Sequence, residues 1–188
     1  MTDLQVYATG AIKGIPVEIY WILMAIFCFG TGLLLWRKGL KEGLRYSTML
    51  LLAEWVIVIL CTTVFFRESG DEMRINLIPL SSYFDIPENS YLMEVTAINI
   101  LNVVLFVPVG FLLVSGFRKM TWQRALVIGA LLSFSIELLQ LILRRGLCET
   151  DDVIHNVIGC AIGYGIITLT KDVNLNLDIN LDQVRSDK

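Results

Sequence analysis

The chain has 188 residues, of which 55% are hydrophobic and 18% are charged, and its formal net charge at pH 7 is −3. Soluble domains carry about 25% charged residues, so this composition excludes an ordinary soluble domain and favours a chain that folds in a lipid bilayer. The small negative charge also argues against nucleic acid as a partner.

Five segments are long and apolar enough to cross a bilayer, because each approaches the roughly 20 helical residues that a crossing needs. In chain order they are residues 17–36, 48–66, 98–117, 124–143 and 153–170. Backbone polar groups find no water in hydrocarbon, so each segment must be helical. We therefore predict an all-α fold: one integral membrane bundle of about five transmembrane helices, residues 1–171, followed by a tail, residues 172–188.

Basic residues in two short loops predict the orientation of this bundle, because cytoplasmic loops carry an excess of Lys and Arg. Residues 37–47 and 117–124 connect the first to the second and the third to the fourth helix, and they hold Arg37, Lys38, Lys41, Arg45, Arg118, Lys119 and Arg124. With both loops inside, ten of the fifteen basic residues are cytoplasmic. The N-terminus then lies outside and the C-terminal tail lies in the cytoplasm.

The tail alternates apolar and polar residues from Val173 to Asp182. A period of two is typical of a β-strand. A lone strand has nothing to pair with, so we expect either an unstructured tail or a strand that pairs with a partner or a second copy of the chain.

Polar side chains recur on one face of the fourth predicted helix. Ser133, Glu137, Gln140 and Arg144 follow one another at spacings of four, three and four, which places them on one stripe. An ionisable group inside a spanning helix costs about 2.5 to 3.5 kcal/mol on insertion scales. Each such group therefore needs a partner or water.

The fifth predicted helix carries a matching stripe of Asp152, Asn156, Gly159 and Gly163. The two glycines form a GxxxG pair, which lets another helix approach closely. We therefore expect the polar stripes of the fourth and fifth helices to face one another.

These stripes predict a polar pocket that opens toward the outer leaflet. Asn102 of the third helix and Asp151, which precedes Asp152, belong to the same outward half of the bundle. Arg144 and Arg145 lie at the mouth of this pocket, where a guanidinium group can bind a phosphate or carboxylate. Helical phase favours Arg144 as the arginine that points inward.

Two other interpretations remain open. The polar side chains could serve only as interhelical hydrogen bonds, each worth about 0.6 kcal/mol. Alternatively, Glu137 or Asp152 could act as a base or metal ligand in an enzyme, with Asp151 as a further oxygen ligand for Mg²⁺. The sequence has no HExxH, P-loop or GxSxG motif and a single histidine, His155, which we expect to be a surface or packing residue. It therefore assigns no catalytic residue, and we predict neither a cofactor nor a metal.

The motifs of this half of the chain resemble those of the VanZ-like (teicoplanin-resistance) family. Residues 102–113 read NVVLFVPVGFLL and are similar to the family's asparagine and LFxPxG core, with Asn102, Pro108 and Gly110. SIELLQ at 135–140, an arginine at 144 or 145, DDVIHNVIG at 151–159 and GY at 163–164 follow in the family's order. NLIP at 76–79, with Asn76 and Pro79, resembles the family's NLxP element, although Leu80 replaces the usual aromatic residue.

The resemblance implies a multi-helix protein of the bacterial plasma membrane, and the founding family member is associated with low-level teicoplanin resistance. Teicoplanin is a lipoglycopeptide that acts on a lipid-linked cell-wall precursor at the outer membrane face. We therefore expect membrane lipids, and a lipid-linked precursor or lipoglycopeptide, as partners of the predicted pocket. A membrane enzyme that modifies a lipid-linked cell-envelope substrate is the main alternative function. A small transporter is a third possible function, but the chain shows no inverted repeat.

Pro108 is expected to kink the third helix, and Gly110 is expected to permit close packing.

Overall fold

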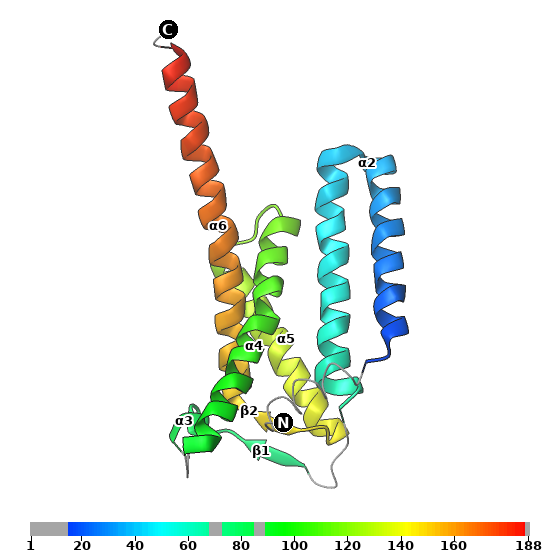
Figure 1. Cartoon of the computed structure of the whole chain (residues 1–188), viewed down its shortest axis with the longest axis vertical. Helices are drawn as coiled ribbons and strands as arrows, with labels where there is room; N and C mark the ends of the chain where they lie inside the picture. The colour runs from blue at the N-terminus through cyan, green and yellow to red at the C-terminus, as the bar shows by residue number, and fades with distance from the viewer. Residues whose placement is uncertain (1–14, 68–72, 85–88, 187–188) are drawn as a thin grey trace.

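The computed structural model describes residues 15–67, 73–84 and 89–186 and is mostly helical. Its elements are shown in Figure 1. In chain order they are α2 (Val17–Leu60), the π-helix η1 (Cys61–Phe65), β1 (Arg74–Asn76), α3 (Ser81–Phe84), α4 (Asn89–Gly116), α5 (Trp122–Leu143), β2 (Leu147–Glu149) and α6 (Thr150–Ser186).

Four helices of the described residues are long and apolar enough to cross a membrane. Their spans are Val17–Phe65, Thr96–Gly116, Trp122–Leu143 and Thr150–Thr170. Most of their large apolar side chains are exposed on the surface of the bundle, where lipid replaces water as the solvent. The chain is therefore a multi-pass membrane protein.

The long helix α2 is interrupted at Gly39, whose φ of 74° and ψ of 174° are not helical. An unbroken helix of 44 residues would be about 66 Å long, twice the thickness of the hydrocarbon core. Figure 1 shows that the chain reverses at this point, so that two antiparallel arms lie side by side. The expected loop over residues 37–47 is thus wrong in its extent, because a single glycine makes the reversal and its neighbours stay helical.

The closest helix contact is between α4 and α6. A Cβ atom added at Gly159 would lie 2.1 Å from the carbonyl oxygen of Val103, and one at Gly163 would lie 2.0 Å from that of Val107. On the other helix, a Cβ at Gly110 would lie 2.0 Å from the carbonyl oxygen of Cys160. The GxxxG pair of α6 therefore packs on α4, not on the polar stripe of α5 that we expected it to face.

The contact between α6 and α5 is polar. Asn156 Nδ2 donates a hydrogen bond of 2.9 Å to Ser133 Oγ, and both residues are buried. One turn further along α6, Cys160 packs against Gly129 and the carbonyl oxygen of Ala125. The two helices thus meet through members of the predicted stripes, while the glycines of α6 turn toward α4.

Helix α4 continues through Pro108 from Asn89 to Gly116. Proline has no N–H group, so the carbonyl of Val104 loses its intrahelical donor there. Phe106 and Val109, on either side of Pro108, are fully buried in the core of the bundle.

At the end of the bundle opposite the α2 reversal, two short strands cover the helix ends (Figure 1). β1 and β2 pair in parallel, with Ile75 opposite Cys148 and Asn76 opposite Glu149. The sequence predicted only loops here, because three-residue strands are too short for an alternating pattern to be visible. The pair joins two connections that are more than 70 residues apart in the chain.

The alternating pattern of the C-terminal tail predicts a strand, but the structure has a helix there. Residues 172–186 continue α6 to Ser186. Adding residues to a helix that already exists has no nucleation cost and pairs every new backbone N–H group. A strand would need a partner chain for its backbone groups.

Candidate functional site

Buried polar side chains converge beneath the strand pair, where α5 ends, α6 begins and Asn102 of α4 lies beside them. Glu137 of α5 is 3% exposed, and its Oε2 accepts a hydrogen bond of 3.0 Å from the backbone N–H of Glu149 in β2. Asp152 of α6 accepts a hydrogen bond of 2.7 Å from Asn102 Nδ2 of α4. The carboxylates of Glu137 and Asp152 are close enough to repel each other electrostatically. We call this group, with Glu149 and Asp151, the carboxylate cluster.

Arg67 is the cation that acts on this cluster among the described residues, and it directly follows the second predicted helix, outside the predicted site. Its charge acts favourably on Glu137, Glu149 and Asp152. Its guanidinium lies against Gly146, where an added Cβ would be 2.9 Å from Arg67 Nη1. A single arginine directly after an apolar segment was the available signal, but only the tertiary structure brings it beside carboxylates that are 70 to 85 positions later in the chain.

The two arginines predicted at the pocket mouth directly follow the last helical residue of α5. Arg144 is the C-cap of α5 in the left-handed conformation, with φ 55°, and is exposed. Helical phase therefore does not apply to it, because the helix ends at Leu143. Arg145 Nη1 donates to the carbonyl oxygen of Val64 at 3.0 Å and also to that of Phe65.

Gln140 has a similar role, because its Nε2 donates a hydrogen bond of 2.9 Å to the carbonyl oxygen of Thr63. The last carbonyls of a helix have no intrahelical donor. Gln140 and Arg145 together supply donors to the end of η1. They therefore anchor the second arm of α2 to α5 and bring Arg67, two residues beyond η1, to the carboxylate cluster.

The NLIP element forms the turn that follows β1. Asn76 Oδ1 accepts from the backbone N–H of Ile78 at 3.3 Å, which is an Asx-turn. Asn76 Nδ2 donates to Ser81 Oγ at 2.7 Å and to Glu149 Oε1 at 3.4 Å. Burial raises the pKa of Glu149 and repulsion from Asp151 adds to this, while the Asn76 hydrogen bond and Arg67 act in the opposite direction.

Pro79 precedes Leu80, which has a positive φ of 61° and donates its N–H to Asp151 Oδ1. A left-handed residue here turns the backbone amide toward α6. Leu80 contributes a backbone group to this contact, so the absence of the family's usual aromatic side chain leaves the contact with Asp151 intact.

His155 is buried between α3 and α6. Its Nδ1 lies 2.6 Å from the carbonyl oxygen of Asp151, and its Nε2 lies 2.7 Å from the hydroxyl oxygen of Tyr83. A carbonyl oxygen can only accept, so Nδ1 carries the proton, and in the neutral ring Nε2 accepts from Tyr83. We expected a surface or packing role for His155, and the structure buries it and gives it two specific hydrogen bonds.

Two buried oxygen atoms next to the cluster have no hydrogen-bond partner among the described residues. They are Oε1 of Gln140 and Oδ1 of Asn156, on side chains that are 2% and 5% exposed. Each is one helical turn from a carboxylate of the cluster, Glu137 and Asp152 respectively. The site therefore has an excess of hydrogen-bond acceptors over donors.

The described residues include no group of three His, Cys, Asp or Glu side chains arranged to hold a metal ion. Two cavities, of about 240 and 440 Å³, lie at the other end of the bundle, around the connection between α4 and α5. The carboxylate cluster is instead packed beneath β1 and β2.

Comparison with known protein families decides the relationship of this chain. A family model described as VanZ/LLP1 matches residues 48–171, which is well over half of the sequence. The chain belongs to the VanZ/LLP1 family. The VanZ/LLP1 match begins in the second arm of α2 and includes every residue of the carboxylate cluster, whereas the first arm of α2 lies outside it. Searches of curated proteins and of solved structures found no match.

Proposed function

We propose that this VanZ/LLP1 family protein binds a lipid-linked or lipoglycopeptide ligand at the outer leaflet of the bacterial plasma membrane, and so confers low-level tolerance of teicoplanin. One observation carries the proposal. Carboxylates and amide groups from five separate elements, with Arg67 from the connection after η1, meet at a single end of the bundle, around Glu137.

The topology that we propose has five crossings, with the N-terminus outside. Each arm of α2 on either side of Gly39 is about as long as one crossing, and α4, α5 and α6 supply three more. The basic residues Arg37, Lys38, Arg118 and Lys119 then lie on the cytoplasmic side. The carboxylate cluster, at the opposite end, faces the outer leaflet.

Interhelical hydrogen bonding explains part of this cluster but not all of it. Asn156 bonds Ser133 and Asn102 bonds Asp152, as helix association alone would require. The unpartnered oxygens of Gln140 and Asn156 have no such explanation, since a buried polar atom without a partner costs about 1 to 3 kcal/mol. A ligand with hydroxyl, amine or amide N–H groups would satisfy these acceptors.

The surroundings of the cluster favour an amphipathic ligand. Met73, Ile75, Leu77 and Ile78, in and around β1, are all more than half exposed. They form an apolar rim beside half-buried Glu149. In this proposal the carboxylates accept hydrogen bonds from the sugar or peptide part of the ligand, Arg67 balances the charge of the carboxylates, and the rim contacts a lipid chain.

The decisive experiment compares two buried glutamates. A teicoplanin-susceptible host expresses the wild type, Glu137→Gln or Glu54→Gln at matched membrane levels, and growth is measured across teicoplanin concentrations. Glu54 is the matched control, because it is 7% exposed and also inside a spanning helix but belongs to α2. We expect the wild type and Glu54→Gln to raise tolerance and Glu137→Gln to lose at least half of that increase.

Equal protection by all three chains would mean that the carboxylate cluster only holds the helices together, and it would reject the binding site. Absence of protection by the wild type would reject the resistance role. Arg67→Gln and Asn156→Ala then test whether the loss extends to the cation near Glu137 and to the amide one helical turn from Asp152.

An enzymatic function is favoured by one contact, the hydrogen bond between the Tyr83 hydroxyl and His155 Nε2. A hydroxyl group that donates a hydrogen bond to an imidazole nitrogen is the arrangement found between a nucleophile and its general base. Mass spectrometry of lipid extracts from cells with the wild type, Tyr83→Phe or His155→Gln tests it. A modified lipid that only the wild type produces would replace the binding proposal with an enzyme.

A further inference from the structure

A groove of about 440 Å³ lies at the other end of the bundle, where α4 connects to α5. Its walls combine two kinds of side chain. The basic residues Arg118, Lys119 and Arg124 lie at the connection, and the apolar residues Phe117, Val127 and Ile128 continue along the start of α5. No acidic residue is among the described residues that line it.

We propose that this groove binds an anionic phospholipid, with the phosphate held by Lys119 and Arg124 and an acyl chain lying along Val127 and Ile128. This site is separate from the carboxylate cluster, and the proposal does not depend on the ligand of that cluster.

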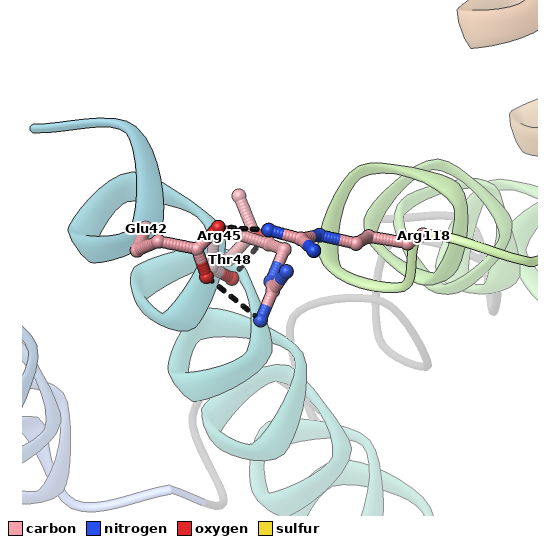
Figure 2. Close-up of polar contacts among 4 residues, drawn as sticks. All are labelled: Glu42, Arg45, Thr48 and Arg118. Carbon is pink, nitrogen blue, oxygen red and sulfur yellow. Dashed lines mark hydrogen bonds and ion pairs between the residues drawn. The ribbon is translucent and has the colours of Figure 1, made fainter. Parts of the chain in front are cut away.

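The basic side chains around this groove differ in their partners. Arg118 forms an ion pair with Glu42 of α2, and Glu42 also pairs with Arg45 at 3.0 Å (Figure 2). The Arg118 guanidinium therefore points toward α2, as Figure 2 shows, and is paired there with Glu42. This contact attaches the α4–α5 connection to the second arm of α2, which fixes one wall of the groove.

Lys119 and Arg124 carry the remaining positive charge of the groove. Both are exposed, and Arg124 Nη1 donates a hydrogen bond of 2.9 Å to the carbonyl oxygen of Lys119. This bond holds the guanidinium over the connection while most of its donors stay available. A positioned guanidinium next to an ammonium group is a suitable receptor for a phosphodiester, because little side-chain freedom is lost on binding.

The apolar wall decides between a lipid and a soluble anion. Val127 and Ile128 are exposed on α5, inside the segment Trp122–Leu143 that is long and apolar enough to cross the membrane. Lipid chains therefore contact these side chains directly. A soluble phosphate would use only the basic half of the groove, whereas a phospholipid matches both halves.

The test uses the full-length protein, purified in a neutral detergent and freed of lipid. Phosphatidylglycerol and phosphatidylcholine with identical acyl chains are titrated, and native mass spectrometry reports the bound fraction. The test variant is Lys119→Gln with Arg124→Gln. The matched control is Arg37→Gln with Lys38→Gln, which removes the same charge from exposed residues near the reversal of α2, outside the groove.

We expect the wild type and the control to prefer phosphatidylglycerol, and the test variant to bind it at least about five-fold more weakly, since each basic residue contributes roughly that factor near an anionic lipid. Lys119→Arg should retain the preference. Circular dichroism and the thermal midpoint report whether each variant is folded.

Equal binding of the two lipids by the wild type would overturn the proposal. An equal loss in the control and the test variant would also overturn it, since attraction would then be a property of the whole basic end. Displacement of the lipid by millimolar inorganic phosphate alone would identify a soluble-anion site in place of a lipid site.

Discussion

At the scale of single residues, the glycines of α6 determine how closely the helices approach. Gly159 and Gly163 contact the carbonyl oxygens of α4, where no side-chain atom fits. In a membrane, helices associate through close packing, because lipid removes the hydrophobic driving force between them. The position of Asp152 against Asn102 depends on this close approach, since both lie on the same pair of helices.

We predict that Gly159→Ala lowers the free energy of unfolding by about 1 to 3 kcal/mol, because the new Cβ would be 2.1 Å from the backbone of α4. Gly165→Ala, on the same helix, is the control, because nothing lies within 4 Å of its added Cβ. That change should be neutral or stabilising by up to about 1 kcal/mol through helix propensity. The free energy of unfolding, measured by titration of micelles with a denaturing detergent, compares them. Equal stability of the two variants would contradict the close contact.

Arg144 and Arg145 show how a local backbone change redirects side chains. The stripe from Ser133 to Arg144 assumes a helix that continues, but α5 ends one residue earlier, and Arg144 is left-handed. Arg145 then reaches the carbonyl groups of η1. Because α5 ends at Leu143, helical phase does not determine where the Arg144 side chain lies, and helix ends are the least certain feature of a sequence prediction.

At the scale of elements, α2 shows that a glycine can replace a loop. The arms on either side of Gly39 remain helical, and the residue itself has a φ of 74° and a ψ of 174°, a region that is almost exclusive to glycine. The basic residues of the predicted loop are consequently held on helical turns. Because of this order, Glu42 can pair with both Arg45 and Arg118.

We expect Gly39→Ala to cost about 1 to 3 kcal/mol of stability, although an added Cβ there would meet no atom within 4 Å. The cost comes from backbone strain alone. Gly32→Ala is the matched control, since its added Cβ also meets nothing within 4 Å and its backbone is helical. Thermal unfolding of the purified variants distinguishes them, and an unchanged midpoint for Gly39→Ala would show that the reversal does not require this conformation.

At the scale of the whole molecule, the two ends of the bundle differ in chemistry. One end carries the carboxylate cluster with an apolar rim, and the other carries basic residues around a groove. The proposed orientation places the acidic end outside and the basic end inside, because cytoplasmic loops of membrane proteins carry an excess of Lys and Arg.

Cys148 offers a direct test of this orientation, because it is the only cysteine outside the spanning helices in the described residues. We expect a membrane-impermeant maleimide to label it in intact cells, and labelling to be absent in Cys148→Ser. Burial raises the pKa of this thiol, and the nearby carboxylates of Glu137, Asp152 and Glu149 raise it further. Labelling should therefore be slow at neutral pH and faster as the pH rises, because the thiolate reacts. Labelling only after permeabilisation would reverse the orientation.

Much of this protein was predictable from its sequence. The apolar segments, the helical class and the VanZ/LLP1 relationship follow from composition and from ordered motifs, because a bilayer forces every crossing backbone to pair internally. The polar stripes of α5 and α6 were also visible, since helical periodicity depends only on spacing along the chain.

Tertiary structure decided what these residues contact. Arg67, the strand pair, the Tyr83 and His155 contact, and the packing of the α6 glycines on α4 all join segments that are tens of residues apart. The tail is the clearest case: its period of two is that of a strand, yet residues 172–186 are helical. A periodic pattern reports which side chains could share a face, whereas the backbone adopts the structure that satisfies its own hydrogen bonds with the neighbours that the fold supplies.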